Sequence, residues 1–179
     1  VLRYPDFGVA EVRTVEGRLS FPYVPGLLSF REVPLAIAAW EKLSLAPDLL
    51  LVDGQGLAHP RRLGLASHLG LLLDIPTIGC AKSILTGHHG PLGEEASSRA
   101  ELVDGGEVVG ALLRTRRGSK PITVSIGHKV DLETAIDLVL RCSRGYRLPE
   151  PTRLAHRAAA GQREEGLYGP PAVVEGQEE

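Results

Sequence analysis

The chain of 179 residues contains no methionine, two cysteines and only 4 % aromatic residues. Cys80 and Cys142 show no CxxC spacing, so neither a disulfide framework nor a zinc cluster is indicated. A reducing, cytoplasmic location fits this cysteine usage. No apolar stretch is long enough to cross a bilayer, and the first residues do not resemble a signal peptide. These absences disfavour secreted disulfide-rich, zinc-binding and membrane-spanning proteins.

The net charge of −2 gives no direct argument for a nucleic-acid partner. The charge is uneven, however, because residues 163–179 contain one arginine and five glutamates, a net of −4, which leaves +2 on residues 1–162. Basic residues cluster at 61–62, 114–120 and 141–147. Each cluster alone is typical of a solvated surface, but together, around an acidic site, they are suited to holding phosphates.

Strand and helix patterns alternate along the chain, which predicts an α/β fold with helices on both faces of a sheet. We expect one domain over residues 1–160 and a flexible acidic tail at 161–179. Residues 86–99 have a loop-like composition. The expected strands are 7–15, 19–21, 49–52, 77–81, 107–115 and 122–126, and the expected helices are 29–42, 63–73, 131–145 and 152–160.

Two helix starts carry capping signals. Ser29 with Glu32 forms a capping-box pattern. Asp131 precedes a run with helical apolar spacing, for which Gly145 is the expected C-terminal cap.

Asp53 follows the apolar run 49–52 and begins a glycine-rich turn. Four consecutive large apolar residues indicate a strand buried on both faces, and the carboxyl end of such a strand is where open α/β folds most often carry function. Gly54 and Gly56 remove side chains that would block the approach of a ligand to the backbone. The alternative is an aspartate that only stabilises a turn.

Lys82 follows the next expected strand, 77–81, so Asp53 and Lys82 are expected to face one crevice. A lysine and carboxylates around one crevice suit a divalent cation with a phosphate ligand, and Mg²⁺ needs few protein oxygens. The alternatives are that Glu32 only caps its helix, that Lys82 is a surface lysine, and that His59 is a satisfied loop histidine. Cys80 falls within an apolar strand pattern, which favours a buried, inert thiol over a nucleophile.

Taken together, the segments of this chain resemble the endonuclease V family, the deoxyinosine-specific nucleases. No single segment is decisive, but the whole set is specific and follows the order of the family from Pro22 to His156. The matching segments are Phe21–Gly26, Phe30–Glu32, Asp53–Gly56, His59–Gly70, Gly79–Ser83, Ser125–His128 and Tyr146–His156.

The resemblance implies a ribonuclease-H-like fold, with a mixed central sheet flanked by helices and a magnesium site. It implies a repair endonuclease that cleaves DNA at the second phosphodiester bond on the 3′ side of deoxyinosine and related deaminated bases. Some members of the family prefer inosine in RNA. The expected partner is therefore DNA containing deoxyinosine, or RNA containing inosine. We expect the protein to act as a monomer and not to associate with a membrane.

The resemblance also implies roles for four catalytic residues. Asp53 matches the metal-binding aspartate on the central strand, and Glu32 matches the catalytic glutamate at the helix start. His156 matches a position near the metal, and Lys82 matches a lysine near the scissile phosphate.

Tyr23, held between Pro22 and Pro25, matches the aromatic residue of the wedge that separates the strands. Such a ring can replace a base in the stack while the lesion rotates into a pocket. Recognition of hypoxanthine is expected to use backbone groups in the turns that contain Gly54 and Gly79, and His59 belongs to the expected substrate-binding residues.

One feature departs from the family, which carries another metal-binding aspartate on the first strand of the sheet. That strand would precede Val1, and Asp6 lies in the wrong local context to replace it, so we expect the first strand and one ligand to be missing. The alternative function is then a non-catalytic fragment that binds inosine-containing nucleic acid. A small-molecule nucleotide binder ranks below both, because the proline-flanked Tyr23 has no use there.

Overall fold

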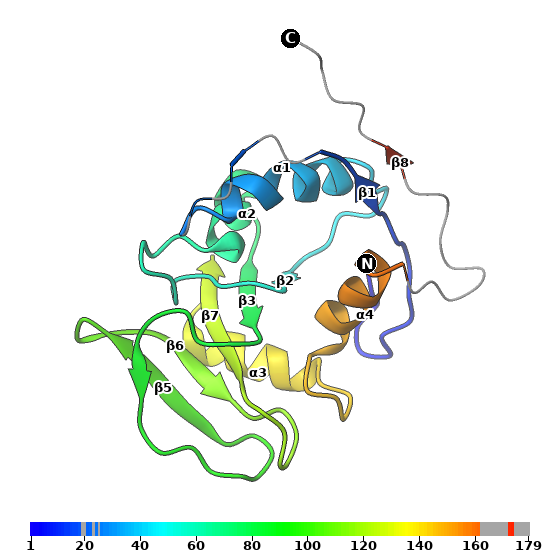
Figure 1. Ribbon diagram of the computed structural model, residues 1–179. Coiled ribbons are helices and arrows are strands. Elements are labelled where there is room, and N and C mark those ends of the chain that lie inside the picture. Colours follow the sequence, from blue (N-terminus) through cyan, green and yellow to red (C-terminus); the bar gives the residue numbers. More distant parts are fainter. Residues whose placement is uncertain (19–20, 23, 25, 162–171, 174–179) are drawn as a thin grey trace. The chain divides into compact units, whose positions relative to one another are not determined.

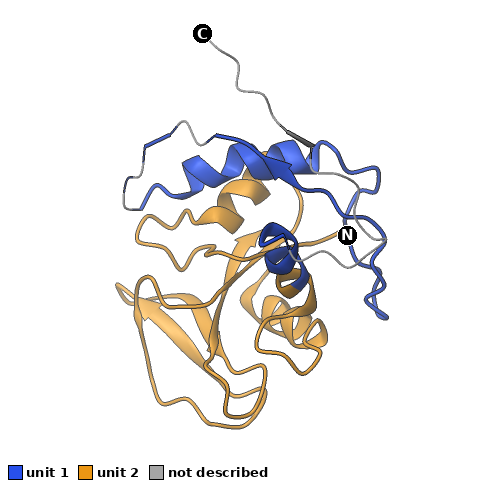
Figure 2. Ribbon diagram, turned by 45° about the vertical axis from the view of Figure 1, so that its right-hand side comes forward, with its two compact units in different colours: residues 1–47, 154–179 blue, residues 48–153 orange. Residues whose placement is uncertain are grey.

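The computed structural model describes residues 1–18, 21–22, 24, 26–161 and 172–173. It divides into two compact units, which are described separately: unit 1 comprises Val1–Pro47 and Leu154–Glu179, and unit 2 comprises Asp48–Arg153 (Figure 2). Within the described parts of the chain, no helix is both long and apolar enough to cross a membrane.

Unit 2 is built on a six-stranded mixed sheet with the order β2-β3-β7-β6-β5-β4 (Figure 1). β2 and β3 are parallel, and the other neighbouring pairs are antiparallel. The strands are β2 (Leu50–Val52), β3 (Thr77–Ala81), β4 (His88–His89), β5 (Arg99–Asp104), β6 (Glu107–Leu113) and β7 (Ile122–His128).

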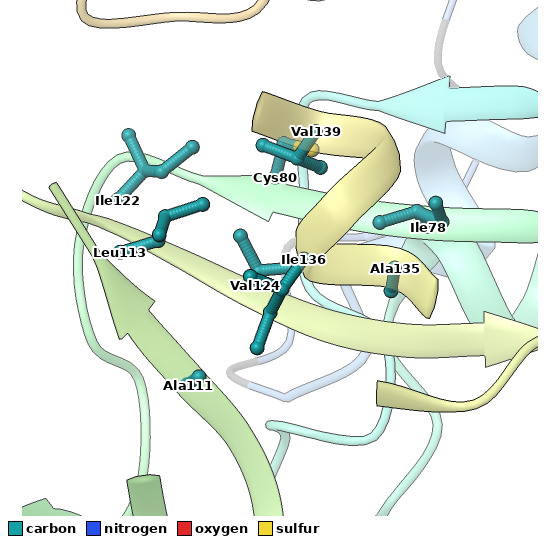
Figure 3. Packing of buried hydrophobic residues seen from close by; sticks show 9 residues of the cluster. All are labelled: Ile78, Cys80, Ala111, Leu113, Ile122, Val124, Ala135, Ile136 and Val139. Atoms are coloured by element: carbon teal, nitrogen blue, oxygen red, sulfur yellow. The ribbon is translucent and has the colours of Figure 1, made fainter. Parts of the chain in front are cut away.

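Helices α2 (Leu65–Leu73) and α3 (Leu132–Arg141) pack on opposite faces of this sheet. The residues of β3 alternate between these two helices, since neighbouring side chains of a strand point to opposite faces of the sheet. Ile78 and Cys80 belong to the buried core with the apolar residues of α3 (Figure 3). Thr77 points to the other face, where its hydroxyl donates to the carbonyl of Ala66 in α2. The predicted mixed sheet flanked by helices is confirmed.

The central elements were predicted closely. β3 has the predicted bounds, and β2 and α2 differ from prediction by one and two residues at their starts. Asp131 caps α3 as predicted, because its carboxylate accepts the backbone N–H of Thr134 at 2.8 Å. Gly145 does not end this helix: the C-terminal cap is Cys142, and Gly145 lies in the following turn with φ of 78°.

Strand β5 was missed in the sequence. It forms a hairpin with β6 through Gly105 and Gly106, which have φ of 62° and 83°. Two adjacent residues with positive φ suit the tight turns of twisted hairpins. A Gly-Gly pair between apolar runs was therefore a usable signal. The predicted loop at 86–99 also contains the short strand β4, which pairs with β5.

Unit 1 contains β1 (Val15–Glu16), α1 (Ser29–Trp40) and β8 (Ala172–Val173). α4 (Glu150–Ala159) begins in unit 2 and ends in unit 1. The predicted strand at 7–15 is wrong, since Val15 is its only residue in a strand, Val9 forms an isolated bridge with Leu2, and Phe7 has φ of 60°. The predicted strand at 19–21 and the predicted flexible tail lie largely outside the described residues.

The predicted capping box of α1 is wrong. Ser29 is the first helical residue, and the preceding Leu28 has helical angles (φ −58°, ψ −34°) with no side-chain cap. The structure therefore does not support the alternative in which Glu32 serves only to complete a capping box.

Candidate functional site

Asp53 and Lys82 meet at one end of the sheet. The parallel register pairs Leu50 with Thr77 and Val52 with Gly79, so each charged residue directly follows the end of its strand. Lys82 Nζ donates to Asp53 Oδ2 at 2.6 Å, and the side chains are 37 % and 31 % exposed. The structure brings the two charged groups together, as expected for parallel neighbours, which present their carboxyl ends at one edge of the sheet.

This pair has two chemical capacities. A carboxylate oxygen is a ligand that hard divalent cations prefer, and an ammonium group is a compact point charge that binds phosphate. Both groups are partly accessible to solvent. The Asp53–Lys82 pair can therefore hold a phosphate oxygen and a cation side by side.

The turn after β2 is fastened to the strands around it. The buried N–H of Gly56 donates to Ser125 Oγ on β7 at 2.8 Å, and the Gln55 amide donates to the carbonyl of Ser83 at 2.8 Å. The second bond joins the residues that follow the ends of β2 and β3. Gln55 and Ser125 thus position the segments that carry Asp53 and Lys82, a role that the sequence did not reveal.

The glycines at this edge serve packing. A Cβ on Gly56 would lie 2.0 Å from the carbonyl oxygen of Ile126, and one on Gly79 would lie 2.6 Å from the Gly56 nitrogen. A Cβ on Gly54 would lie 3.2 Å from the Cβ of Leu65. The space that we expected a ligand to use beside these Cα atoms is filled by the protein itself. Substrate contacts of Gly54 and Gly79 stay a prediction that depends on their backbone groups.

His59 is buried in the same loop, with 7 % exposure. Its Nδ1 accepts the backbone N–H of Arg61 at 3.2 Å. Burial lowers the pKa of the imidazole, and the nearby Arg61 charge lowers that pKa further. A neutral ring with an internal partner favours the loop-histidine interpretation over a direct phosphate contact.

Arg62 joins this loop to the β5–β6 hairpin. Its guanidinium donates to Asp104 Oδ2 at 2.8 Å, to Glu107 Oε2 at 2.9 Å and to the carbonyl of His59 at 3.1 Å. The hydrogen bond from Arg62 holds the pKa of the Asp104 carboxyl below its usual range. The positive charge of Arg62, which the sequence suggested for phosphate binding, is neutralised within the protein.

The remaining predicted site residues belong to unit 1 or are not described. Glu32 is half-buried in the first turn of α1, His156 is exposed in the second half of α4, and Pro22 precedes α1. Unit 1 is described by itself, so the association of these residues with Asp53 stays a prediction. Tyr23 and Pro25 lie outside the described residues.

Two further observations concern metal and thiol chemistry. In the described part of the chain, no three His, Cys, Asp or Glu side chains form a group that could hold a metal ion. Cys80 is fully buried in the core, and burial raises the pKa of its thiol well above the ordinary value. The prediction of an inert thiol at this position is confirmed.

The mixed sheet, its flanking helices and the Asp53–Lys82 pair at the end of two parallel strands define a ribonuclease-H-like protein. The family model described as endonuclease V matches residues 1–157. An endonuclease V from Dehalococcoides mccartyi is 59 % identical over 160 residues, which are 89 % of this chain and 72 % of that protein. One from Trichormus variabilis is 56 % identical over 90 % of this chain and 73 % of its own length. This chain therefore belongs to the endonuclease V family, whose named members are endonucleases.

Solved structures agree with this assignment. Human endonuclease V superimposes with a TM-score of 0.80 at 34 % identity, covering 89 % of this chain and 74 % of the human one. The Streptomyces avermitilis protein gives 0.77 at 49 % identity, covering 81 % and 64 %. The Ciona intestinalis protein, solved with DNA containing an inosine followed by a ribo-adenosine, gives 0.66 at 32 % identity, covering 81 % and 69 %. This chain thus spans less than two thirds of the Streptomyces structure.

Proposed function

We propose that this protein is a metal-dependent endonuclease that cleaves the second phosphodiester bond on the 3′ side of deoxyinosine or inosine. The observation that carries the proposal is the Asp53–Lys82 pair at 2.6 Å, at the sheet edge of an endonuclease V chain. The inosine-containing DNA in the Ciona structure supports the choice of substrate.

The donor chemistry of Asp53 fits Mg²⁺, which proteins commonly hold through one or two carboxylates and the phosphates of the substrate. We propose Asp53 as the ligand of this ion, with Glu32 and His156 as further members of the catalytic set on the family resemblance. The ion would supply Lewis-acid polarisation of the phosphate and a water molecule of lowered pKa. Lys82 stabilises the negative charge that develops on the phosphate oxygens.

Lys82 and Asp53 have different roles at the phosphate: Lys82 contacts the phosphate oxygens, and Asp53 binds the metal ion. The ammonium group, already held beside the carboxylate, orients the phosphodiester without a large change in its own position. The Gln55 bond to the Ser83 carbonyl holds this arrangement while the substrate binds. The protein therefore contributes mainly positioning and electrostatic stabilisation.

Replacement of Asp53 by asparagine tests the proposal. We expect Mg²⁺-dependent nicking of an inosine-containing duplex to disappear, because the amide removes the anionic ligand while keeping the side-chain shape. Asp48→Asn is the matched control, since Asp48 is exposed and precedes the other end of the same strand. Undiminished nicking by Asp53→Asn would exclude the metal role. Inosine-selective binding without any nicking by the unaltered chain would instead identify a non-catalytic binder.

The proposed wedge has its own test. Tyr23→Ala is expected to weaken binding to inosine-containing DNA by about 1–3 kcal/mol, the range for stacking between a base and an aromatic ring. Tyr23→Phe keeps the ring and should retain the affinity, as measured by fluorescence anisotropy. Equal affinities of all three proteins would refute the wedge.

A further inference from the structure

A pocket of about 440 Å³ opens in unit 2 next to Lys82. Lys82 contributes to its wall, but Asp53 and the turn after β2 do not. We name this cavity the Lys82 pocket. Its lining comes from four segments of unit 2, which are Lys82–Ile84, His89–Leu92, residues of β6 and β7 with the turn between them, and Arg147.

The Lys82 pocket is strongly cationic. Lys82, Arg114, Lys120 and Arg147 line it, and no aspartate or glutamate of the described residues does. Except for Lys82, which pairs with Asp53, none of these cations has an ion-pair partner among the described residues. An uncompensated group of cations attracts anions and lowers the free energy of a bound phosphate.

The two arginines are held in place without being neutralised. Arg147 donates to the carbonyls of Lys82, Lys120 and Pro121 at 2.5, 3.0 and 2.9 Å. Arg114 donates to the carbonyls of Gly93 and Ser119. Carbonyl acceptors fix the guanidinium planes but leave their positive charge intact. This arrangement is pre-organised for an anionic ligand, because little side-chain freedom remains to be lost on binding.

Thr123 gives an independent indication of a ligand. It lines the pocket, is 1 % exposed, and its hydroxyl has no hydrogen-bond partner among the described residues. A buried hydroxyl without a partner is unfavourable, and such groups in folded proteins are normally satisfied. A polar ligand in the pocket, or a water molecule bound together with such a ligand, would supply a hydrogen-bond partner for the Thr123 hydroxyl.

The remaining lining suits the rest of a nucleotide. Ile84, Pro91, Leu92 and Leu112 add apolar surface beside the cations. The volume lies within the range of small-molecule sites, which combine apolar walls with a few placed polar groups. A free phosphate would leave these apolar walls uncovered, whereas a sugar and base attached to it would cover them.

We infer that the Lys82 pocket binds one nucleotide of the substrate strand on the 3′ side of the cleaved bond. This inference depends on the proposed function, in which Lys82 lies at the cleaved phosphate and the inosine lies on the 5′ side, toward the turn that contains Gly54. The pocket extends from Lys82 without including that turn, so the strand that leaves the cleaved phosphate enters it. The phosphate of this nucleotide contacts Arg114, Lys120 and Arg147.

The test compares two inosine-containing single strands. One ends in a 3′-phosphate at the position of the cleaved bond, and the other continues for about six nucleotides beyond it, within the site size of single-strand grooves. Lys120→Gln should weaken binding of the extended strand about three- to tenfold and reduce its salt slope by about 0.7, with little effect on the short strand. Arg116→Gln is the matched control, because Arg116 is an exposed cation of the same turn that does not line the pocket.

A second variant separates binding from folding. Thr123→Val removes the buried hydroxyl and keeps the shape, so it should bind the extended strand more weakly while its thermal stability is equal or higher. Single phosphates on the 3′ flank can be replaced one at a time by neutral methylphosphonates. We expect the replacement at one position, that of the phosphate bound in the pocket, to abolish the difference in affinity between Lys120→Gln and the unaltered protein, and replacements at the other positions to leave it.

The outcomes distinguish this inference from the proposed function. An equal loss for short and extended strands, or a loss that follows extension of the 5′ flank, overturns the 3′ pocket. An equal effect of Arg116→Gln also overturns it, because general surface charge then explains the binding. The protein could instead bind strands with and without inosine equally, while its affinity still depends on the 3′ flank and on Lys120. That result overturns the proposed function but not the proposed nucleotide pocket.

Discussion

The two regions beside the Asp53–Lys82 pair contain similar residues but differ in how those residues are used. In the turn after β2, Arg62 is paired with Asp104 and Glu107, and the space beside Gly56 is filled by backbone. In the Lys82 pocket, and among the described residues, Arg147 is bound only to carbonyls and the Thr123 hydroxyl has no partner. In the first region the charges are paired and the space is filled by protein atoms. The second region retains positive charge and a polar group that a ligand can contact.

This difference shows that a basic cluster in a sequence does not by itself identify a phosphate site. What matters is whether an acidic side chain neutralises the cation. In the cluster at 114–120, Arg114 and Lys120 line the pocket, whereas Arg117 is exposed and paired with Glu95. Arg114 and Lys120 therefore place positive charge in the wall of the pocket, whereas Glu95 compensates the charge of Arg117.

The largest expected effect concerns the packed turn. Gly56→Ala places a Cβ at 2.0 Å from the Ile126 carbonyl oxygen, so the backbone must move. We expect a loss of about 3 kcal/mol in the free energy of unfolding, the upper part of the range for overpacking. Urea denaturation measures this loss. Gly90→Ala is the control, because nothing lies within 4 Å of its added Cβ. Equal stability of the two variants would show that this turn is not tightly packed.

A smaller effect is expected from two hydroxyls of β7. Ser125→Ala leaves the buried N–H of Gly56 without its acceptor, which should cost about 1–3 kcal/mol. Thr123→Val removes a hydroxyl that has no described partner and should leave the free energy of unfolding unchanged or slightly higher. The same urea experiment compares them. If both variants lose the same free energy of unfolding, the Thr123 hydroxyl contributes to folding as the Ser125 hydroxyl does, and the contrast between the packed turn and the Lys82 pocket is wrong.

The smallest effect concerns the ion pairs of Arg62. The pKa of Asp104 lies below its usual value because Arg62 donates to it, so this interaction stabilises the fold above the unfolded pKa and is lost as the pH falls through the folded pKa. Arg62→Gln should therefore lower the melting temperature most near neutral pH, and the difference from the unaltered protein should narrow below about pH 4.

The control for that experiment is Arg117→Gln, which breaks a largely solvent-exposed pair with Glu95. Exposed pairs contribute little to stability, so this variant should melt as the unaltered protein does across the same pH range. A difference for Arg62→Gln that stays constant down to strongly acidic pH would show that Asp104 is not the relevant partner.

Much of unit 2 could be predicted because its signals are local. The apolar runs at 49–52 and 77–81 identified two strands, and their expected parallel placement brought Asp53 and Lys82 together in the prediction. β3 is buried as expected, whereas β2 is the edge strand of the sheet, and its Leu50 and Leu51 are only half-buried. The strand at 7–15 was wrong, since its loose alternation carries no information about a pairing partner, and β5 was missed because its Gly105-Gly106 turn was not weighed. The Ser29–Glu32 pattern matched a capping box by spacing alone, but the helical angles of Leu28 exclude it.

The sequence by itself determined the family, and through that resemblance the mixed sheet. It also determined the charged residue that follows each of two apolar runs, because an apolar run and the residue after it are adjacent in the chain. Only the tertiary structure decided which cations are neutralised and which hydroxyls are paired. Arg62 meets Asp104, Gly56 meets Ser125 and Arg147 meets the Lys82 carbonyl across 42, 69 and 65 residues of chain. Local spacing does not encode such contacts, since they form when separate elements pack against one another.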